Sequence, residues 1–287
     1  MISQLFGAVM LIYLFVAIFF LMAELWSSSR IQAAARILLW LGLGVQTAAL
    51  LGRWWQSYHL ALGHSPAAAF SERLRLIILQ APLSNFYDSL IFFAWCLPVL
   101  GLIAFRRYFK GYLGALLAVL STLLLAYASL GGVDSRIKPL MPALKSNWLL
   151  IHVVTCFLGY SAFALAFGVA ILYLVQDRRP RPSLPAPPIL DGLIYRATIL
   201  GFLLLTLGIF TGAVWAETAW GRYWSWDPKE TWSLITWLIY AALLHARLLK
   251  GWHGRRIAWL AVLGFMAVLF TYFGVSFLLS GLHSYLT

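Results

Sequence analysis

The sequence predicts an all-α membrane protein, a polytopic helix bundle with about eight transmembrane helices and both termini on the extracytoplasmic side. Hydrophobic residues make up 62% of the 287-residue chain and charged residues only 10%, whereas a soluble domain needs more charge to cover its surface. Apolar runs of about 18 to 25 residues recur along the chain, and each is long enough to cross a hydrocarbon core. Lys and Arg gather in every second connection between these runs, which is typical of cytoplasmic loops.

The expected spans cover residues 2–25, 34–51, 88–105, 111–130, 148–176, 192–216, 231–249 and 257–281. Each should be a helix, because backbone groups surrounded by lipid need hydrogen-bond partners within their own segment. The first span has no basic segment before it and no small-residue cleavage site, so we expect it to be a retained helix rather than a signal peptide.

The orientation follows from the short basic connections. These contain Arg30 and Arg36; then Arg106, Arg107 and Lys110; then Arg178, Arg179 and Arg181; and finally Arg247, Lys250, Arg255 and Arg256. We expect them to be cytoplasmic, which places connections 52–87, 131–147 and 217–230 outside together with both termini. The net charge of +12 does not indicate a nucleic-acid partner, since no soluble module carries a basic stripe with interleaved aromatics.

The chain should form a single membrane domain, 1–287, in two parts. Residues 178–191 contain five prolines between Pro180 and Pro188 and are predicted to form an extended cytoplasmic linker. This linker divides a five-helix part, 1–177, from a three-helix part, 192–287. Residues 73–79 form a short amphipathic stretch suited to a membrane surface. Residues 82–88 favour a helix start, with Asn85 as its cap and Asp88 in its first turn, over a functional motif.

Tryptophan is concentrated near the C-terminus, where six of the fourteen residues lie between Trp215 and Trp237. An aromatic belt at the membrane interface explains one or two rings per helix end, but not three between Trp220 and Trp226. A flat ligand would use stacked rings, and an anionic one would use Arg222 or Lys229 as counter-charge. The next residues also have a structural role, because Asp227-Pro228-Lys229-Glu230 has the pattern of a helix-starting capping box.

Two histidines lie where they could serve a ligand at the Trp-rich loop. His152 is about one turn inside the outer end of the fifth span, and His283 lies just past the outer end of the eighth. They could supply two axial imidazoles to a haem iron, or they could be ordinary interface histidines. The remaining candidates are better explained as loop histidines (His59, His64 and His253) and buried thiols (Cys96 and Cys156).

The segment Trp220-Gly221-Arg222-Tyr223-Trp224-Ser225-Trp226-Asp227-Pro228-Lys229-Glu230-Thr231-Trp232 resembles the WWD motif of the haem-handling proteins of cytochrome c biogenesis. Its Asp-Pro-Lys-Glu-Thr form, and the stretch 82–90, are similar to the CcsA (ResC) family of the second maturation system. The resemblance is strong over about 145–287 and weak over the first two spans. It implies that haem b is bound by Trp215, Trp220, Gly221, Arg222, Trp224, Trp226, Asp227, Trp232 and Trp237. It further implies His152 and His283 as ligands of an outer haem iron, and His245 as a ligand of an inner one.

The same resemblance implies a function. The chain would move haem from the cytoplasmic side to the outer face and present it for thioether attachment to the CxxCH segment of apocytochrome c. It would act as a component of a holocytochrome c synthase complex, in a bacterial cytoplasmic membrane or a thylakoid membrane. A CcsB (ResB) partner would complete the inner site, and other partners would keep the substrate thiols reduced, because this chain has no CxxC. His245 follows Thr231 by 14 residues, which places it roughly 20 Å below the outer helix end.

Two other classes remain open on the residues alone. The first is a cofactor-free transporter with an aromatic gate at Trp220–Trp226 and His245 as a proton carrier. The second is an electron-transferring b-type cytochrome. That class usually places two axial histidines on one helix, and no expected span here carries two.

Overall fold

The computed structural model describes residues 2–63, 70–108, 111–141, 144–181 and 184–281. Helices account for most of these ranges, and none of them contains a β-strand. The elements are α1 (Ile2–Leu25), α2 (Ser29–Gly63), α3 (Phe70–Leu79), α4 (Phe86–Ala104), α5 (Gly111–Leu130), α6 (Asn147–Arg178), α7 (Pro187–Trp220), α8 (Pro228–Lys250) and α9 (Arg255–Leu269). The last span continues from α9 through the π-helical turn η2 (Phe270–Gly274) into α10 (Val275–Leu278).

The prediction of an all-α membrane bundle is confirmed. Eight helical segments of the described chain are long and apolar enough to cross a membrane, and they correspond one to one with the expected spans. Two of them are longer than their apolar runs. Helix α2 extends to Gly63. Its last turns contact α3 through a hydrogen bond of 2.6 Å from Trp54 Nε1 to the carbonyl of Ile77. Helix α7 starts at Pro187 rather than near 192, because proline suits the first helical turn. The described non-helical residues before α7 are therefore 179–181 and 184–186.

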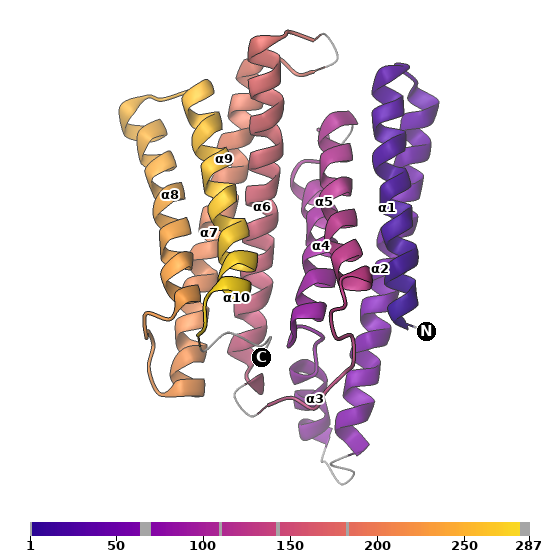
Figure 1. Cartoon of the computed structure of the whole chain (residues 1–287), viewed down its shortest axis with the longest axis vertical. Helices are drawn as coiled ribbons and strands as arrows, with labels where there is room; N and C mark the ends of the chain where they lie inside the picture. The colour runs from indigo at the N-terminus through magenta and orange to yellow at the C-terminus, as the bar shows by residue number, and fades with distance from the viewer. Residues whose placement is uncertain (1, 64–69, 109–110, 142–143, 182–183, 282–287) are drawn as a thin grey trace.

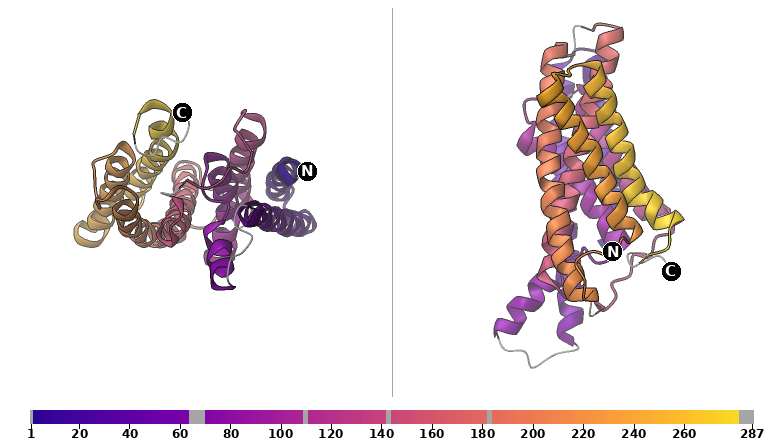
Figure 2. Two further views of the ribbon diagram at one scale, coloured as in Figure 1. Left: turned by 90° about the horizontal axis from the view of Figure 1, so that it is seen from below. Right: turned by 90° about the vertical axis from the view of Figure 1, so that its left-hand side faces the viewer.

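The helices form two groups that lie side by side (Figures 1 and 2). One group contains α1, α2, α4 and α5, and the other contains α6 to α10. Helix α6 packs along α7 and α9 and also contacts α4, so it joins the two groups. The Pro-rich linker thus connects two helices that pack against each other, and α6 groups with the helices that follow it.

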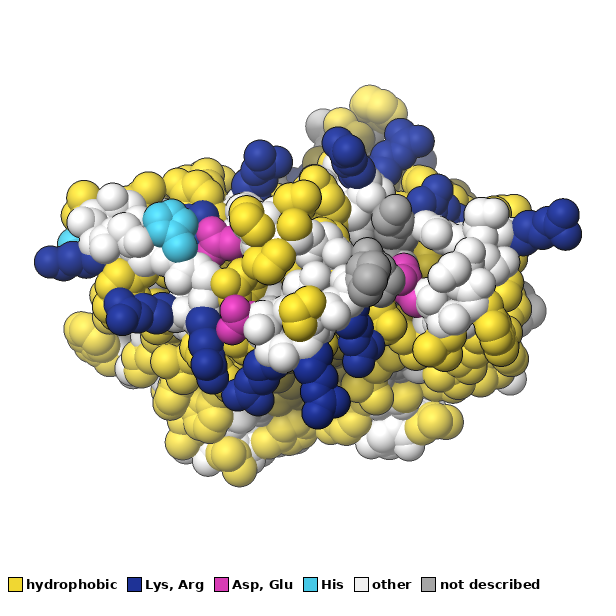
Figure 3. All heavy atoms as spheres, turned by 90° about the horizontal axis from the view of Figure 1, so that it is seen from above, with side chains coloured by type: hydrophobic (Ala, Val, Ile, Leu, Met, Phe, Trp, Pro, Cys, Tyr) yellow, Lys and Arg dark blue, Asp and Glu magenta, His cyan; other side chains and the backbone are white. Residues whose placement is uncertain are grey.

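The two ends of the bundle differ in charge. The connections after α1, α4, α6 and α8 lie at one end, the upper end in Figure 1, and Figure 3 shows Lys and Arg side chains around its rim. We call this the basic end. The chain starts at the opposite end, and α10 also finishes there (Figure 1). The basic end agrees with the expected arrangement of loops, and its location on the cytoplasmic side stays a prediction.

A buried ion pair fixes the start of α4. Arg53 Nε on α2 donates to Asp88 Oδ1 at 2.5 Å, and the two side chains are only 4% and 5% exposed. The Arg53 guanidinium also lies 4.8 Å from the centre of the Tyr87 ring. Asn85 caps the helix as predicted, with its side chain accepting from Asp88 N at 2.7 Å. Together these contacts hold the beginning of α4 in a defined position against α2.

A second ion pair fixes the basic end of the other group. Asp191, in the first turns of α7, accepts from Arg247 Nη2 of α8 at 2.7 Å and from the backbone N–H of Gly254 at 2.7 Å. Gly254 is the residue before α9 and has a φ of +66°, a conformation that glycine adopts readily. One carboxylate therefore links α7 to α8 and to the turn that begins α9.

The connection from α5 to α6 runs along the end opposite to the basic one. Its Asp134 is paired with Arg136 and Lys138 at 2.9 Å each. Hydrogen bonds from Arg136 and Lys138 hold the pKa of the exposed Asp134 carboxyl well below its usual range. The connection then brings Leu144 to the wall of the cavity described next.

Candidate haem site beneath the tryptophan-rich loop

The Trp-rich loop is a short, strongly hydrogen-bonded turn between α7 and α8. Helix α7 ends with Gly221 in the left-handed conformation, at φ +72°, and α8 begins after Asp227. The predicted capping box is confirmed, with both reciprocal hydrogen bonds between Asp227 and Glu230 present. The Glu230 carboxylate also accepts from the backbone N–H of Ser225 at 2.7 Å. Glu230 therefore fixes the conformation of the loop as well as the start of the helix.

Trp226 has a strained backbone within this loop. Its φ is +59°, which is uncommon for a bulky residue, and its side chain is 69% exposed. Thr231 Oγ1 donates to its carbonyl at 3.2 Å. The ring lies edge-on to Trp224, with centroids 5.8 Å apart. The loop thus directs Trp226 outward and Trp224 toward the interior.

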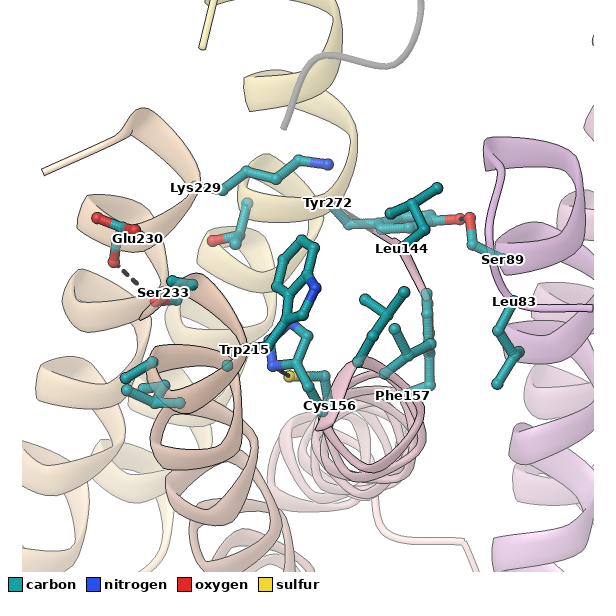
Figure 4. Close-up of a pocket in the computed structure, with 18 of the residues that line it drawn as sticks. Leu83, Ser89, Leu144, Cys156, Phe157, Trp215, Lys229, Glu230, Ser233 and Tyr272 are labelled. Carbon is teal, nitrogen blue, oxygen red and sulfur yellow. Dashed lines mark hydrogen bonds between the residues drawn. The ribbon is translucent and has the colours of Figure 1, made fainter. Parts of the chain in front are cut away.

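A cavity of about 1280 Å³, counting the part open to solvent, lies beneath the loop (Figure 4). Its walls are formed by the start of α4, the parts of α6 and α7 farther from the basic end, the first turn of α8 and the π-helical turn of the last span. Most of the lining is apolar, and its aromatic members are Phe86, Phe157, Tyr160, Trp215, Tyr223, Trp224 and Tyr272. A largely apolar pocket with a few polar groups is the usual form of a small-molecule site.

His152 provides an imidazole in this cavity. Its Nδ1 lies 2.7 Å from the carbonyl oxygen of Gly208 on α7, and a carbonyl can only accept, so Nδ1 carries the proton. In the neutral ring the lone pair is then on Nε2, which is the arrangement of histidines that bind a metal through Nε2. The ring is nearly parallel to Trp215, at 20° and a centroid distance of 6.1 Å. Both the tautomer and the plane of the imidazole are therefore set by α7.

Lys229 provides a cationic side chain at the same cavity. It is half-buried and lines the pocket, and Figure 4 shows its side chain extended across the cavity above Trp215. Glu230, the neighbouring acid, uses its carboxylate within the loop. Asp227 is the acid that interacts electrostatically with Lys229. The ammonium group of Lys229 still lines the cavity, where it could also face the edge of an anionic ligand.

The opposite wall links two distant parts of the sequence. Ser89 Oγ on α4 and the Tyr272 hydroxyl on η2 are 2.7 Å apart. The π-helical turn brings Thr271 and Tyr272 to the cavity, and such turns are frequent at functional sites. Leu83, Ser84, Asn85 and Phe86 belong to the same wall.

Some of the predicted site residues line the cavity, and others lie outside its lining. His152, Trp215 and Trp224 line the cavity. Five others lie outside its lining. Trp220 packs edge-on to Trp215 with ring centroids 4.8 Å apart, and Trp232 packs on Phe270 with centroids 4.2 Å apart. Trp237 donates to Thr206 Oγ1 at 2.9 Å, Asp227 is buried as the helix cap, and Trp226 is exposed. Gly221 and Arg222 are exposed in the loop. The segment thus supplies both a cavity wall and the framework behind it.

The other two predicted iron ligands lie elsewhere. His283 is outside the described residues. Gly281, two positions before it, lies directly against Asp227 and Pro228, so the chain reaches the loop just before that histidine. His245 is exposed on the outer surface of α8, on the same stripe as Leu238, Ala242 and Leu249, and it is absent from the cavity lining.

Sequence reasoning missed much of the cavity wall. Residues 82–88 were interpreted as a helix start, which is correct, but the same stretch also faces the cavity. Ser89 and Tyr272 carry no local signal, because their role depends on two helices that are 183 positions apart in the chain. Lys229 did carry a signal, as a cation beside clustered tryptophans.

The bundle and its cavity define a class, namely polytopic membrane proteins with a mostly apolar cavity near one end of the helix bundle. Comparison with known proteins specifies the family. Residues 83–283 match the family model described as "Cytochrome C assembly protein". The chain is 46% identical over 213 residues to the cytochrome c biogenesis protein CcsA of Chlamydomonas reinhardtii, a match covering 71% of this chain and 60% of that protein. It is 37% identical over 290 residues to CcsA of Synechococcus sp. strain CC9902, covering 90% and 88%.

This chain belongs to the cytochrome c assembly protein family and, within it, to the CcsA proteins. A solved structure, the cytochrome c haem lyase CcmF, has the same fold with a TM-score of 0.65 and 23% sequence identity. That match covers 95% of this chain and 45% of CcmF. The family assigns the chain a role in cytochrome c maturation.

Proposed function

We propose that the chain holds haem b in the cavity beneath the Trp-rich loop and presents it to apocytochrome c. The observation that carries this proposal is His152, an imidazole in a large apolar cavity with its Nδ1 proton committed to the Gly208 carbonyl. The names of the relatives support it, since the CcsA proteins are named for cytochrome c biogenesis and CcmF for haem lyase activity.

The cavity residues fit this ligand in three respects. His152 Nε2 would bind the iron, the apolar and aromatic walls would contact the macrocycle, and Lys229 would pair with a propionate. His283 is the proposed second axial ligand. The bound haem supplies two vinyl groups, to which the two thiols of a CxxCH segment add to form thioether bonds. Residues of this chain would orient and release the haem, as one component of a holocytochrome c synthase complex.

A partner chain would complete the route. His245 is exposed within a membrane span, and an ionisable side chain facing lipid is costly. A CcsB (ResB)-like partner packed on this face of α8 would cover His245 and supply the opposing ligand of an inner haem. Co-expression with such a partner tests this: His245→Ala should lower the haem content of the complex, and an unchanged content would reject the inner site.

The site belongs in the bacterial cytoplasmic membrane or a thylakoid membrane, with the loop extracytoplasmic and separate partners keeping the substrate thiols reduced. Relatives from a green alga and from cyanobacteria support this pair of membranes.

Haem titration of the purified protein tests the outer site. We expect His152→Ala to weaken haem binding and shift the Soret band, because the iron loses an axial ligand. Free imidazole should restore part of both, since it can enter the vacant coordination position. The matched control is His253→Ala, because His253 is exposed and its Nδ1 also lies 2.7 Å from a backbone carbonyl, that of Gly251.

Two outcomes would contradict the proposal. If His152→Ala and the natural chain bind haem with identical spectra, His152 is not a ligand. A colourless natural chain with no spectral change on adding haem would reject haem handling altogether and favour the transporter class.

A further inference from the structure

A second cavity lies at the basic end, far from the Trp-rich loop. It measures about 860 Å³, counting the part open to solvent, and its described walls come from α1, the α4–α5 connection, α5, α6, the Pro-rich linker and α7. Leu113, Val169, Leu172 and Leu193 are among its apolar members. The cavity therefore sits between the group of α1, α2, α4 and α5 and the group of α6 to α10, at the level of the basic connections.

The mouth of this cavity carries positive charge. Arg107 lines it and is exposed at its edge. Tyr112, another lining residue, accepts a long hydrogen bond of 3.5 Å from Arg181 Nη1, which places a second guanidinium beside the opening. Among the described lining residues the one acid is Glu24, which lies directly against Gly111 at the start of α5. There the positive end of the helix dipole offsets its charge.

The chemistry of the lining separates this cavity from the haem site. No histidine, cysteine or methionine is among its described lining residues, so it offers haem iron no imidazole or sulfur ligand. A small soluble anion would leave the aliphatic walls without an apolar partner. An anionic amphiphile satisfies both the walls and the guanidinium groups.

We propose that this cavity binds one anionic phospholipid. Its phosphate pairs with Arg107 at the mouth, and an acyl chain lies along the leucine and valine side chains of α5, α6 and α7. Arginine suits phosphate through paired N–H donors, and basic residues at the headgroup level favour anionic lipids. The bound lipid would contact both helix groups, since both contribute to the cavity walls. This inference does not depend on the proposed haem function.

Native mass spectrometry of the full chain in a neutral detergent tests the proposal. Phosphatidylglycerol is titrated against phosphatidylcholine with the same acyl chains. We expect one phosphatidylglycerol to be retained, about fivefold or more tightly than phosphatidylcholine. Arg107→Ala should abolish this preference. The matched control is Arg106→Ala, which removes a neighbouring exposed arginine that does not line the cavity.

A second pair of variants tests the acyl chain. Leu172→Trp fills the cavity from α6 and should reduce retention of both lipids, whereas Val175→Trp alters an exposed position of the same helix and should not. Equal effects of Arg107→Ala and Arg106→Ala would overturn the proposal, as would lipid retention that Leu172→Trp leaves unchanged. Displacement of the lipid by inorganic phosphate would show that the mouth takes a free anion instead. The haem Soret band should be unaffected in all four variants, and its loss in Leu172→Trp alone would assign the cavity to haem.

Discussion

His152 lies against a part of α7 where two of the residues are glycine. A Cβ added to Gly212 would lie 2.6 Å from His152 Nδ1 and 2.7 Å from Cε1, both closer than a carbon can approach. A Cβ at Gly208 would lie 2.5 Å from Cys156 Sγ, one turn along α6 from the histidine. The small residues of α7 thus allow the imidazole to reach the Gly208 carbonyl.

Gly212 should be needed to keep the His152 ring in place. Gly212→Ala should displace the imidazole and weaken haem binding by about ten- to a hundredfold, the range typical of changes that disturb the support of a metal-binding histidine. Gly192→Ala is the matched control, since it lies on the same helix with no atom within 4 Å of the added Cβ. Haem titration of both variants checks this. Equal affinities would mean that the ring position does not matter.

The charge of Lys229 should distinguish free from esterified propionates. The natural chain should bind haem about tenfold or more tightly than haem dimethyl ester, because the ester cannot form a charge-assisted hydrogen bond with the ammonium group. Lys229→Gln should bind the two ligands equally. Parallel titrations measure this difference, with Arg222→Gln as the exposed control. If Arg222→Gln removes the discrimination instead, the loop arginine holds the propionate.

At the scale of the helices, the Arg53–Asp88 pair determines where α4 begins and hence where Asn85 and Phe86 meet the cavity. Asp88→Asn should lower the free energy of unfolding by about 3–5 kcal/mol, because Arg53 is then a buried charge without its partner. Replacing both residues, as Arg53→Met with Asp88→Leu, should recover most of this loss. Thermal unfolding in detergent measures the stability of these variants. The control Asp177→Asn, at an exposed position, should change the free energy of unfolding little. If Asp88→Asn leaves the free energy of unfolding unchanged, the pair does not stabilise the helix start.

The spans were predictable because lipid allows few alternatives, so length and hydropathy identify each helix. The ends of the helices were less predictable from the sequence. The extension of α2 depends on α3, which holds it through Trp54, and hydropathy contains no information on that contact. The cavity wall likewise depends on contacts between helices. Trp215 and Trp224 were predicted from the local concentration of tryptophan, and His152 from its place near the end of a span. Ser89 and Tyr272, in contrast, meet across two helices. Sequence spacing does not give distances between helices, so that wall required the structure.

For the whole molecule, the Trp-rich cavity and the basic end are separated along the bundle. The cavity and Trp-rich loop occupy one end of the bundle, and the Arg-rich connections occupy the other. Because short basic connections stay on the cytoplasmic side, we expect the cavity to face outward, where the proposed presentation of haem would take place.

Cysteine labelling in intact cells can test this orientation with little background, since Cys96 and Cys156 are both buried. A membrane-impermeant maleimide should label Arg222→Cys, in the exposed loop, without permeabilisation. Arg179→Cys, at the end of α6 on the basic end, should be labelled only after the membrane is opened. The reversed pattern would place the Trp-rich loop in the cytoplasm. In that case the cavity would receive haem rather than deliver it, and the outward presentation proposed for His152 would have to be abandoned even if the imidazole binds iron.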